Sequence, residues 1–398
     1  MFLLSERVIK LGEKRLSLNP KIDEISPKLY GTTSAPDHSI SGGEAVSEAG
    51  QAKWRKRTAR FVEIAELAGV STTTVDRVLN ERGSVSPKTR ERVVAAARKL
   101  ALPRLLPDTH HGLIHIDVLV PDSNAPFFAR LRQALQRSVQ MLDKRVVVHV
   151  VPMSGEDEER IPEIVGRSRY RRAALVVTAR DTPRVRDALA AAIGQGEAVV
   201  TMVTDIAGID RAHYAGIDNL RAGRTAGYFV GRLAKQPGRV LLLPARMDYR
   251  AHIDRIEGCR MELAERFAHL TCEVEPSETR DEDDQCYRAV SAALKRGGLV
   301  AIYNTGYGSA GIEAALRGFG GAGKVVWVGH EMLDRHRDYI EAGLMDIAID
   351  QDPDGQVISA LQHVLHACRV VDEAPPSQPV EFRLFCSANV RASPYLQS

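Results

Sequence analysis

From residue 115 onward, short runs rich in valine, isoleucine and leucine alternate with amphipathic segments, and this alternation covers most of the chain. Such a pattern is typical of parallel strands joined by crossover helices. The expected strands of the first series are IDVLVP, VVVHVVP, AALVVTA and AVVTMVTD, with helices at 127–142, near 159 and at 182–193. A second series begins near 218, with strands RVLLLPA, LVAIYNTG, VVWVGHE and MDIAIDQ and helices at 222–233, 252–267 and 311–316. The sequence therefore predicts two doubly wound α/β lobes in succession, with a ligand cleft between them.

The region ahead of residue 115 differs in composition and pattern. Residues 1–57 are rich in serine, glycine, glutamate and lysine without sustained apolar periodicity, so we expect a disordered extension. A helix at 352–368 is expected to return to the first lobe. The predicted domains are the extension 1–57, a small all-α domain at 58–102, a linker at 103–113, a first lobe at 114–217 and 351–379, and a second lobe at 218–350 and 380–398.

Composition limits the class of protein. With 398 residues, 44% of them hydrophobic, the chain is long enough to bury a sizeable core, and its net charge of +3 is too small for a nonspecific nucleic-acid coat. The five cysteines show no CxxC spacing, which argues against a disulfide framework and a structural zinc site. No apolar run approaches the length of a membrane span, and no signal peptide is evident. We expect a cytoplasmic protein without metal or cofactor.

The segment 61–80, FVEIAELAGVSTTTVDRVLN, has the pattern of two short helices joined by a tight turn. Gly69 permits the turn, and Ser71 is placed to cap the second helix. The residues expected to form the core are Ile64, Leu67, Ala68, Val75, Val78 and Leu79. The second helix then presents Thr72, Thr73, Asp76, Arg77 and Asn80 outward. Short or forked hydrogen-bonding groups of this kind meet base edges and phosphates, so the segment predicts a DNA-binding helix-turn-helix.

A third amphipathic helix follows, with Ser86 as its cap and Pro87 at its first position. Its core positions are Val93, Val94, Ala97 and Leu100, and its other face carries Lys88, Arg90, Arg92, Arg98 and Lys99. A basic run that includes Lys53 and ends at Arg60 precedes the first helix. An arm of this charge can lie along phosphates, or it can be an ordinary solvated charge run.

This segment closely resembles the headpiece of LacI-type transcriptional regulators. The matching residues are Val70, Ser71, Val75, Arg77, Val78, Leu79 and Asn80 in the helix-turn-helix, and Val85, Ser86, Thr89, Arg90 and Val93 in the third helix. The resemblance implies base contacts by Thr72, Thr73 and Arg77 and phosphate contacts by Thr74 and Asn80. We add Ser71 and Arg60 to the predicted DNA-binding set. Operator double-stranded DNA is the implied partner.

Two positions depart from the family pattern. Asp76 stands where the family usually has serine, and a carboxylate near phosphates is repulsive unless it pairs with Arg77. Family members commonly have a hinge helix after the headpiece, whereas here Pro103 and Pro107 disfavour a regular helix in the linker.

Polar and aromatic side chains recur where the expected strands end. The candidate effector-binding residues are Asn124, Phe127, Phe128, Asp205, His252, Arg255, Asn304, His330, Glu331 and Gln351. The carboxyl ends of parallel strands meet at one edge of a sheet, so these groups should converge on the cleft between the lobes. Amides, carboxylates and an arginine around phenylalanine rings suit a neutral polyhydroxylated ring. The sequence predicts a small sugar-like or polyol effector.

This part of the chain is similar to the type I periplasmic-binding-protein fold, which forms the effector domain of LacI-type regulators. In sugar-binding members of that fold, the residues matching Asn124, Phe127, Phe128, Asp205, Arg255, Asn304, Glu331 and Gln351 touch ligand. His330 replaces the family's usual aromatic or small residue, which implies a different polyol from ribose or a galactoside.

The predicted function is a homodimeric, ligand-controlled transcription regulator, most simply a repressor, and not an enzyme. An NAD-dependent oxidoreductase is the main alternative, because Gly306, Gly308 and Gly311 form a GxGxxG between an expected strand and helix, with Glu331 after the next strand. A solute-binding protein for transport is a second alternative, which shares the cleft but requires export.

Overall fold

The computed structural model describes residues 61–80, 82, 84–100, 113–154, 159–168 and 170–395. The chain divides into two units, residues 1–109 and 110–398, which are described separately below. The predicted extension 1–57, Arg60 and the linker prolines lie outside the described residues. Within the described part of the chain, no helix is both long and apolar enough to cross a membrane.

The first unit contains a helix at 61–68, α2 (Thr72–Leu79) and α3 (Pro87–Lys99). Gly69 has a φ of 62°, and the Ser71 and Ser86 hydroxyls accept from the backbone N–H groups of Thr74 and Thr89 at the starts of α2 and α3. The buried core is Ile64, Ala65, Ala68, Val75, Val78, Leu79, Val93, Val94, Ala96 and Ala97. The three elements therefore enclose one small apolar core.

Three predictions within this unit are wrong. Leu67 and Leu100 were expected in the core but are 47% and 38% exposed, because the smaller side chains of Ala65 and Ala96 occupy the interior instead. Arg90, expected on the solvent face of α3, is buried.

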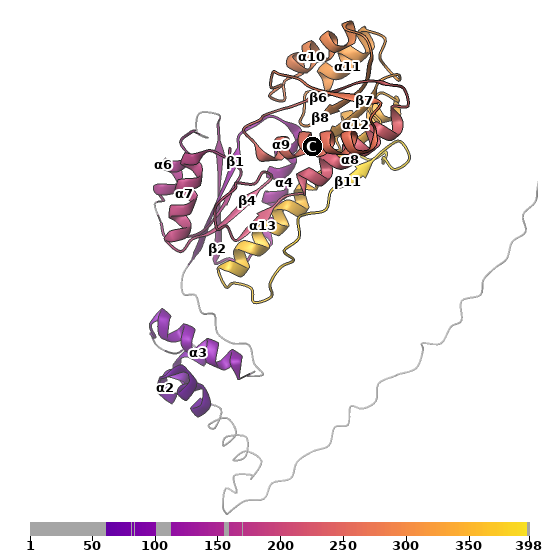
Figure 1. The fold of residues 1–398 in the computed structure, drawn as a ribbon. Helices are drawn as coiled ribbons and strands as arrows, with labels where there is room; N and C mark the ends of the chain where they lie inside the picture. Colours follow the sequence, from indigo (N-terminus) through magenta and orange to yellow (C-terminus); the bar gives the residue numbers. More distant parts are fainter. Residues whose placement is uncertain are drawn as a thin grey trace, which may run out of the picture. The chain divides into compact units, whose positions relative to one another are not determined.

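The first lobe of the second unit is a parallel sheet in the order β2-β1-β3-β4-β5. Its strands are β1 (Ile114–Pro121), β2 (Val146–Met153), β3 (Arg172–Val177), β4 (Ala198–Met202) and β5 (His213–Ala215). Helices α4 (Pro126–Gln140) and α13 (Pro353–Ala367) pack on one face, and α6 (Ile161–Gly166) and α7 (Pro183–Gly194) pack on the other. Figure 1 shows α13 beside the strands of this lobe, although it lies far from them in sequence.

The second lobe has the strand order β11-β10-β9-β8-β6-β7, in which only β11 is antiparallel to its neighbour. Its strands are β6 (Gly238–Leu243), β7 (Leu270–Val274), β8 (Leu299–Asn304), β9 (Val326–His330), β10 (Ile347–Asp350) and β11 (Arg383–Phe385). Helices α8 (Asn219–Leu233) and α9 (Arg250–Arg266) cover one face, and α10 (Asp283–Lys295), α11 (Ser309–Gly318) and α12 (Asp334–Glu341) cover the other.

The predicted fold class, an all-α helix-turn-helix region followed by two doubly wound α/β lobes, is confirmed. The sequence analysis missed β5, β7, β11, α10 and α12. The missed strands are short and incompletely buried, and α12 (DRHRDYIE) has few apolar residues to mark its periodicity.

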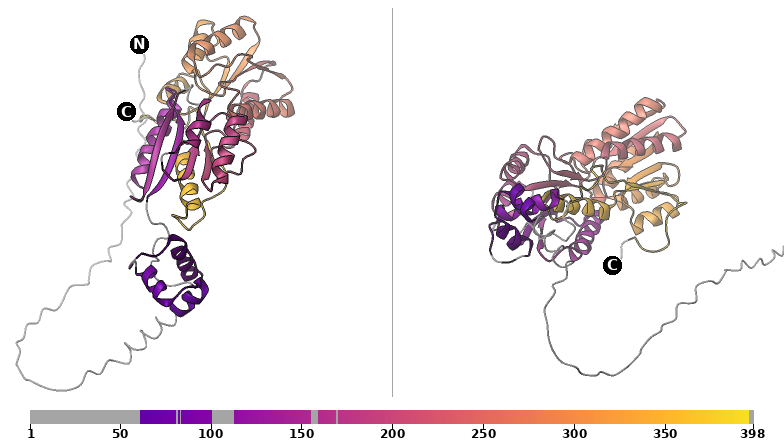
Figure 2. Two further views of the ribbon diagram at one scale, coloured as in Figure 1. Left: turned by 90° about the vertical axis from the view of Figure 1, so that its left-hand side faces the viewer. Right: turned by 90° about the horizontal axis from the view of Figure 1, so that it is seen from below.

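Close packing of α8 against α9 positions one wall of the cleft. A Cβ atom at Gly223 of α8 would lie 2.1 Å from the backbone oxygen of Arg255 in α9, so only glycine allows the two helices to approach this closely. Figure 2 shows the two helices side by side. The same packing positions the first turns of α9, which carry the cleft-lining residues His252 and Arg255.

Candidate ligand cleft and nucleic-acid interface

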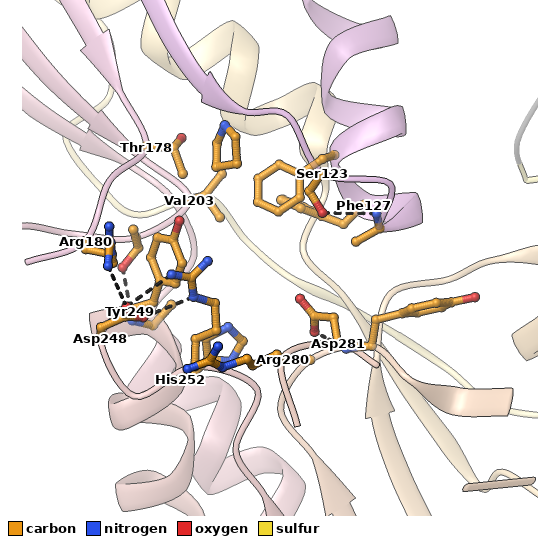
Figure 3. Close-up of a pocket in the computed structure, with 18 of the residues that line it drawn as sticks. Ser123, Phe127, Thr178, Arg180, Val203, Asp248, Tyr249, His252, Arg280 and Asp281 are labelled. Carbon is orange, nitrogen blue, oxygen red and sulfur yellow. Dashed lines mark hydrogen bonds and ion pairs between the residues drawn. The ribbon is translucent and has the colours of Figure 1, made fainter. Parts of the chain in front are cut away.

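A cavity of about 560 Å³ lies between the two lobes. Phe127 and Phe128 of α4 line it from the first lobe, with their rings in an edge contact at 5.2 Å between centroids. Residues of α9 and of the loops after β9 and β10 line it from the second lobe. Figure 3 shows Phe127 and His252 entering the cleft from different elements. The cleft therefore offers an apolar wall on one lobe and polar groups on the other.

The structure brings most of the predicted effector residues together. Phe127, Phe128, His252, Arg255, His330, Glu331 and Gln351 all line the cleft. They come from α4, α9 and the ends of β9 and β10, as the strand-end argument requires.

Three predicted effector residues do not line the cleft. Asn124 is solvent-exposed at the start of α4. Asp205 is held by Arg211, at 2.5 Å, and by the Thr201 hydroxyl, at 2.8 Å. Asn304 is buried beneath the lining, because its side-chain amide donates to the Tyr307 carbonyl at 2.8 Å and its oxygen accepts from the backbone of Gly306. Asp205 and Asn304 instead hold their own loops, and none of the three side chains lines the cleft in this structure.

Arg255 occupies the centre of a buried polar network. Its Nε donates to Asn219 Oδ1 at 2.8 Å, one terminal nitrogen donates to the Thr305 carbonyl at 2.7 Å, and the other donates to Gln351 Oε1. The Gln351 amide in turn donates to Glu331. The network fixes the guanidinium in place before any ligand arrives.

Arg130 of α4 connects the first lobe to this network, and the sequence analysis missed it. Its guanidinium lies 3.1 Å from the Glu331 carboxylate and 2.5 Å from that of Asp350. Burial and the adjacent Asp350 carboxylate raise the pKa of Glu331 to about 8. One cation therefore serves two carboxylates, and Glu331 is the one that retains its proton near neutral pH.

Glu331→Gln should flatten the dependence of stability on pH. The pKa of Glu331 is higher in the folded chain than in the unfolded chain, so folding binds a proton and stability decreases as pH rises from about 4.5 to about 8. Removing the titrating group should remove this part of the decrease. Melting temperatures measured between pH 5 and 8.5 test this, with the exposed Glu381→Gln as the control. An unchanged slope in Glu331→Gln would show that the carboxyl is ionised throughout.

Other lining residues were also absent from the sequence prediction. They include Arg180, Arg246, Asp248, Tyr249, Arg280 and Asp281. Figure 3 shows Arg180 next to Asp248, with Tyr249 close by. Arg246 and Asp248 follow β6 directly, so the strand-end rule applied to every strand would have found them.

The GxGxxG glycines are explained by packing against α10. A Cβ atom at Gly308 would lie 2.5 Å from Cys286 Sγ, and one at Gly311 would lie 1.8 Å from the Asp283 backbone oxygen. The Asp283 carboxylate accepts from the backbone N–H groups of Ala310 and Gly311 at 3.1 and 3.4 Å. A carboxylate of the protein thus already occupies the helix end where a dinucleotide pyrophosphate would bind. The geometry gives no support to the oxidoreductase alternative.

Gly311→Ala should therefore destabilise the fold by about 2–3 kcal/mol through overpacking. Gly318→Ala in the same helix is the matched control, because a Cβ atom there meets nothing within 4 Å. Urea unfolding of both variants gives the two free energies. Equal stabilities, or a rise in the melting temperature of the unaltered protein with NAD⁺, would contradict the packing explanation.

In the first unit, α2 exposes the side chains predicted to read DNA. Thr72, Thr73 and Arg77 are exposed, whereas Thr74 is half-buried with its hydroxyl 2.9 Å from that of Ser71. Asp76 accepts from the Asn80 amide at 2.6 Å, one helical turn away, so its carboxylate is paired with Asn80. The Asn80 amide carries no charge, so this hydrogen bond leaves the negative charge of Asp76 in place, and no ion pair with Arg77 forms among the described residues.

The two lobes, the returning helix and the cleft lined from both sides define a two-lobed ligand-binding protein of the periplasmic-binding-protein type, preceded by a helix-turn-helix. The model of the periplasmic binding protein domain matches residues 116–369, and that of bacterial regulatory proteins of the lacI family matches residues 61–102. The chain belongs to the periplasmic-binding-protein domain family, and its N-terminal helices form a LacI-family headpiece.

Curated relatives match over a limited length. The sucrose operon repressor of Pediococcus pentosaceus is 35% identical over 91 residues, which is 22% of this chain and 27% of that protein. The ribose operon repressor of Bacillus subtilis (strain 168) is 33% identical over 111 residues, covering 27% of this chain and 31% of the relative. The matches thus span less than a third of these relatives.

Among solved structures, GanP, a glucose-galactose binding protein from Geobacillus stearothermophilus, superposes with a TM-score of 0.63. The identity is 14%, and the match covers 70% of this chain and 99% of GanP. This likeness supports the fold of the second unit.

Proposed function

We propose that the protein is a sequence-specific, DNA-binding transcription regulator, most simply a repressor, whose operator affinity is controlled by a small polyhydroxylated effector in the interlobe cleft. The observation that carries the proposal is the presence in one chain of a LacI-family headpiece and a two-lobed domain with a lined cleft. The protein acts in the cytoplasm as a homodimer and catalyses no reaction.

In the proposed DNA complex, Thr72, Thr73 and Arg77 contact base edges from the exposed face of α2. Ser71, Thr74 and Asn80 lie near phosphates, together with Arg60 ahead of the first helix. Two headpieces on one dimer address two half-sites of a near-palindromic operator.

The effector class follows from the cleft. Phe127 and Phe128 offer faces for the C–H side of a sugar-like ring, while Arg255, His252 and His330 offer hydrogen bonds to its polar groups. The names of the sucrose and ribose operon repressors also favour a carbohydrate. Effector binding changes the closure of the two lobes and hence the spacing of the headpieces, so ligand and operator affinities are linked reciprocally.

A solute-binding function in transport shares the cleft, but it gives no role to the headpiece. The proposal is tested by selecting binding sites from random double-stranded DNA with the purified chain. The selected site is then titrated by fluorescence anisotropy at fixed salt, with and without a sugar panel. Enrichment of a near-palindrome whose affinity changes with a sugar supports the proposal. Binding without sequence preference would contradict it.

A further inference from the structure

Arg255 is a buried cation with no carboxylate partner. It is 2% exposed, and the groups that accept from it are an amide oxygen of Asn219, an amide oxygen of Gln351 and the Thr305 carbonyl. Among the described residues, no carboxylate lies within salt-bridge distance of its guanidinium. A guanidinium has five N–H donors, and two of those of Arg255 have no acceptor among the described residues.

The other arginines that line the cleft are paired. Arg180 and Arg246 lie 3.6 and 3.1 Å from the Asp248 carboxylate, and Arg280 lies 3.7 Å from that of Glu278. Arg255 is thus the cleft-lining arginine without an ion pair among the described residues, and the Asp281 carboxylate, which also lines the cleft, acts on it only from beyond salt-bridge distance. A buried charge without a counter-ion is destabilising, so an anion placed beside Arg255 gains more than it would at the cleft mouth.

The Glu331 carboxyl does not fill this role. It shares Arg130 with Asp350 and forms no ion pair with Arg255, because the Gln351 side chain lies between the two and hydrogen-bonds to both. Its pKa is raised to about 8, chiefly by burial, so it is mostly neutral at pH 7. Arg255 therefore keeps its excess positive charge at that pH.

His330 supplies a hydrogen-bond donor beside Arg255. Its Nε2 lies 2.8 Å from the Tyr303 hydroxyl, which is buried and has no other partner among the described residues. The hydroxyl must donate to Nε2, because otherwise its own proton would be buried without an acceptor. The proton of the neutral imidazole is then on Nδ1, which is buried, lacks a partner and belongs to a ring that lines the cleft.

His252 supplies a hydrogen-bond acceptor on the same side of the cleft as Arg255. The Thr305 hydroxyl donates to the Leu243 carbonyl at 3.1 Å, so it can only accept from His252 Nδ1, 3.1 Å away. Burial and the nearby Arg255 cation lower the pKa of His252 to about 3, which leaves Nε2 as an unprotonated acceptor. A hydroxyl group of a ligand can donate to it.

We propose, on the basis of the proposed function, that the effector is a polyhydroxylated carboxylate of the aldonate or uronate type. Its carboxylate accepts from Arg255 and from Nδ1–H of His330, a neighbouring hydroxyl donates to His252 Nε2, and its C–H face lies on Phe127 and Phe128. A carboxylate is favoured over a phosphate, because a single unpaired cation balances one negative charge and not two.

The test compares matched ligands by isothermal titration calorimetry on the full chain at pH 7. D-Gluconate, D-galactonate, D-glucuronate and D-galacturonate are titrated beside D-glucose, D-galactose and D-glucose 6-phosphate. At least one sugar acid is expected to bind ten or more times as tightly as its neutral parent. Arg255→Gln should lower affinity for that acid to the level of the neutral sugar, and His330→Gln should weaken it by a smaller factor.

Two further variants control the comparison. Arg317→Gln removes an exposed arginine of α11 outside the cleft and should leave all affinities unchanged. Arg280→Gln removes a paired arginine of the cleft lining, and loss of sugar-acid binding in this variant alone would place the carboxylate elsewhere and overturn the inference. Because Arg255→Gln can also fail to fold, the comparison of acid with neutral parent in the unaltered protein is decisive by itself.

The remaining outcomes separate the inference from the proposed function. Tighter binding of neutral sugars, or of D-glucose 6-phosphate, overturns the carboxylate assignment and leaves the proposed function standing. Absence of binding by every sugar acid also overturns the inference. Failure to select an operator from random DNA counts against the proposed function, whatever the calorimetry shows.

Discussion

Arg77→Ala is expected to reduce discrimination between the operator and random DNA by about 10- to 100-fold, the equivalent of about 1–3 kcal/mol for a forked arginine contact with a base. Arg77 is exposed on α2, and its side chain makes no hydrogen bond or ion pair with the described residues. Its removal therefore leaves the headpiece core intact. Anisotropy titrations of operator and random duplexes at one salt concentration measure the ratio.

Two control measurements distinguish a base contact by Arg77 from a general loss of positive charge. Effector binding should be unchanged, because the cleft lies in the other unit of the chain. Arg317→Ala removes the same charge from an exposed arginine of α11 and should not alter discrimination. If both variants weaken operator and random DNA equally, Arg77 contributes only charge, and the assignment of α2 as the base-reading helix is wrong.

The sequence predicted the elements with strong periodicity well. The helices containing Phe127 and Arg255 begin and end within three residues of the predicted positions, since an apolar stripe and a capping or breaking residue mark their ends. The prediction that strand ends converge placed His330, Glu331 and Gln351 correctly in the cleft. Both successes rest on local patterns that do not depend on distant partners.

The errors come from partners that local pattern does not reveal. Asp205 forms an ion pair with Arg211, six residues later in the chain, and no sequence pattern in the intervening loop indicates this contact. The dinucleotide alternative arose because α10 was missed. The sequence does not reveal that Asp283 of α10 packs against Gly311. The glycine spacing therefore has no packing explanation at the level of sequence, and it indicates a cofactor site instead.

Arg130→Met is expected to destabilise the second unit by about 3–5 kcal/mol, because it leaves the buried Asp350 carboxylate without its cation and Glu331 without its donor. Arg130 belongs to α4 of the first lobe, whereas Glu331 and Asp350 follow or end strands of the second. The ion pairs thus tie the two lobes together behind the cleft. Burial keeps the three side chains largely out of water, so solvent screens them little.

The penalty should increase with pH. Without Arg130 the pKa of Glu331 rises further above about 8. As the pH passes that value, the unaltered protein stops losing stability because its Glu331 ionises beside Arg130, whereas the variant continues to lose it. In the double variant Arg130→Met/Glu331→Gln this increase should disappear. Urea unfolding at pH 6 and pH 9 measures both effects.

Arg137→Met in the same helix is the matched control. Arg137 pairs with Asp354 at 2.5 Å, but both side chains are more than half exposed, so its loss should cost no more than about 1 kcal/mol. Similar penalties for the two variants would mean that the buried Arg130 contacts add no more than a surface ion pair. In that case the lobes would be held together by apolar packing and by the chain crossings, where Ile217 and Val380 form a parallel bridge.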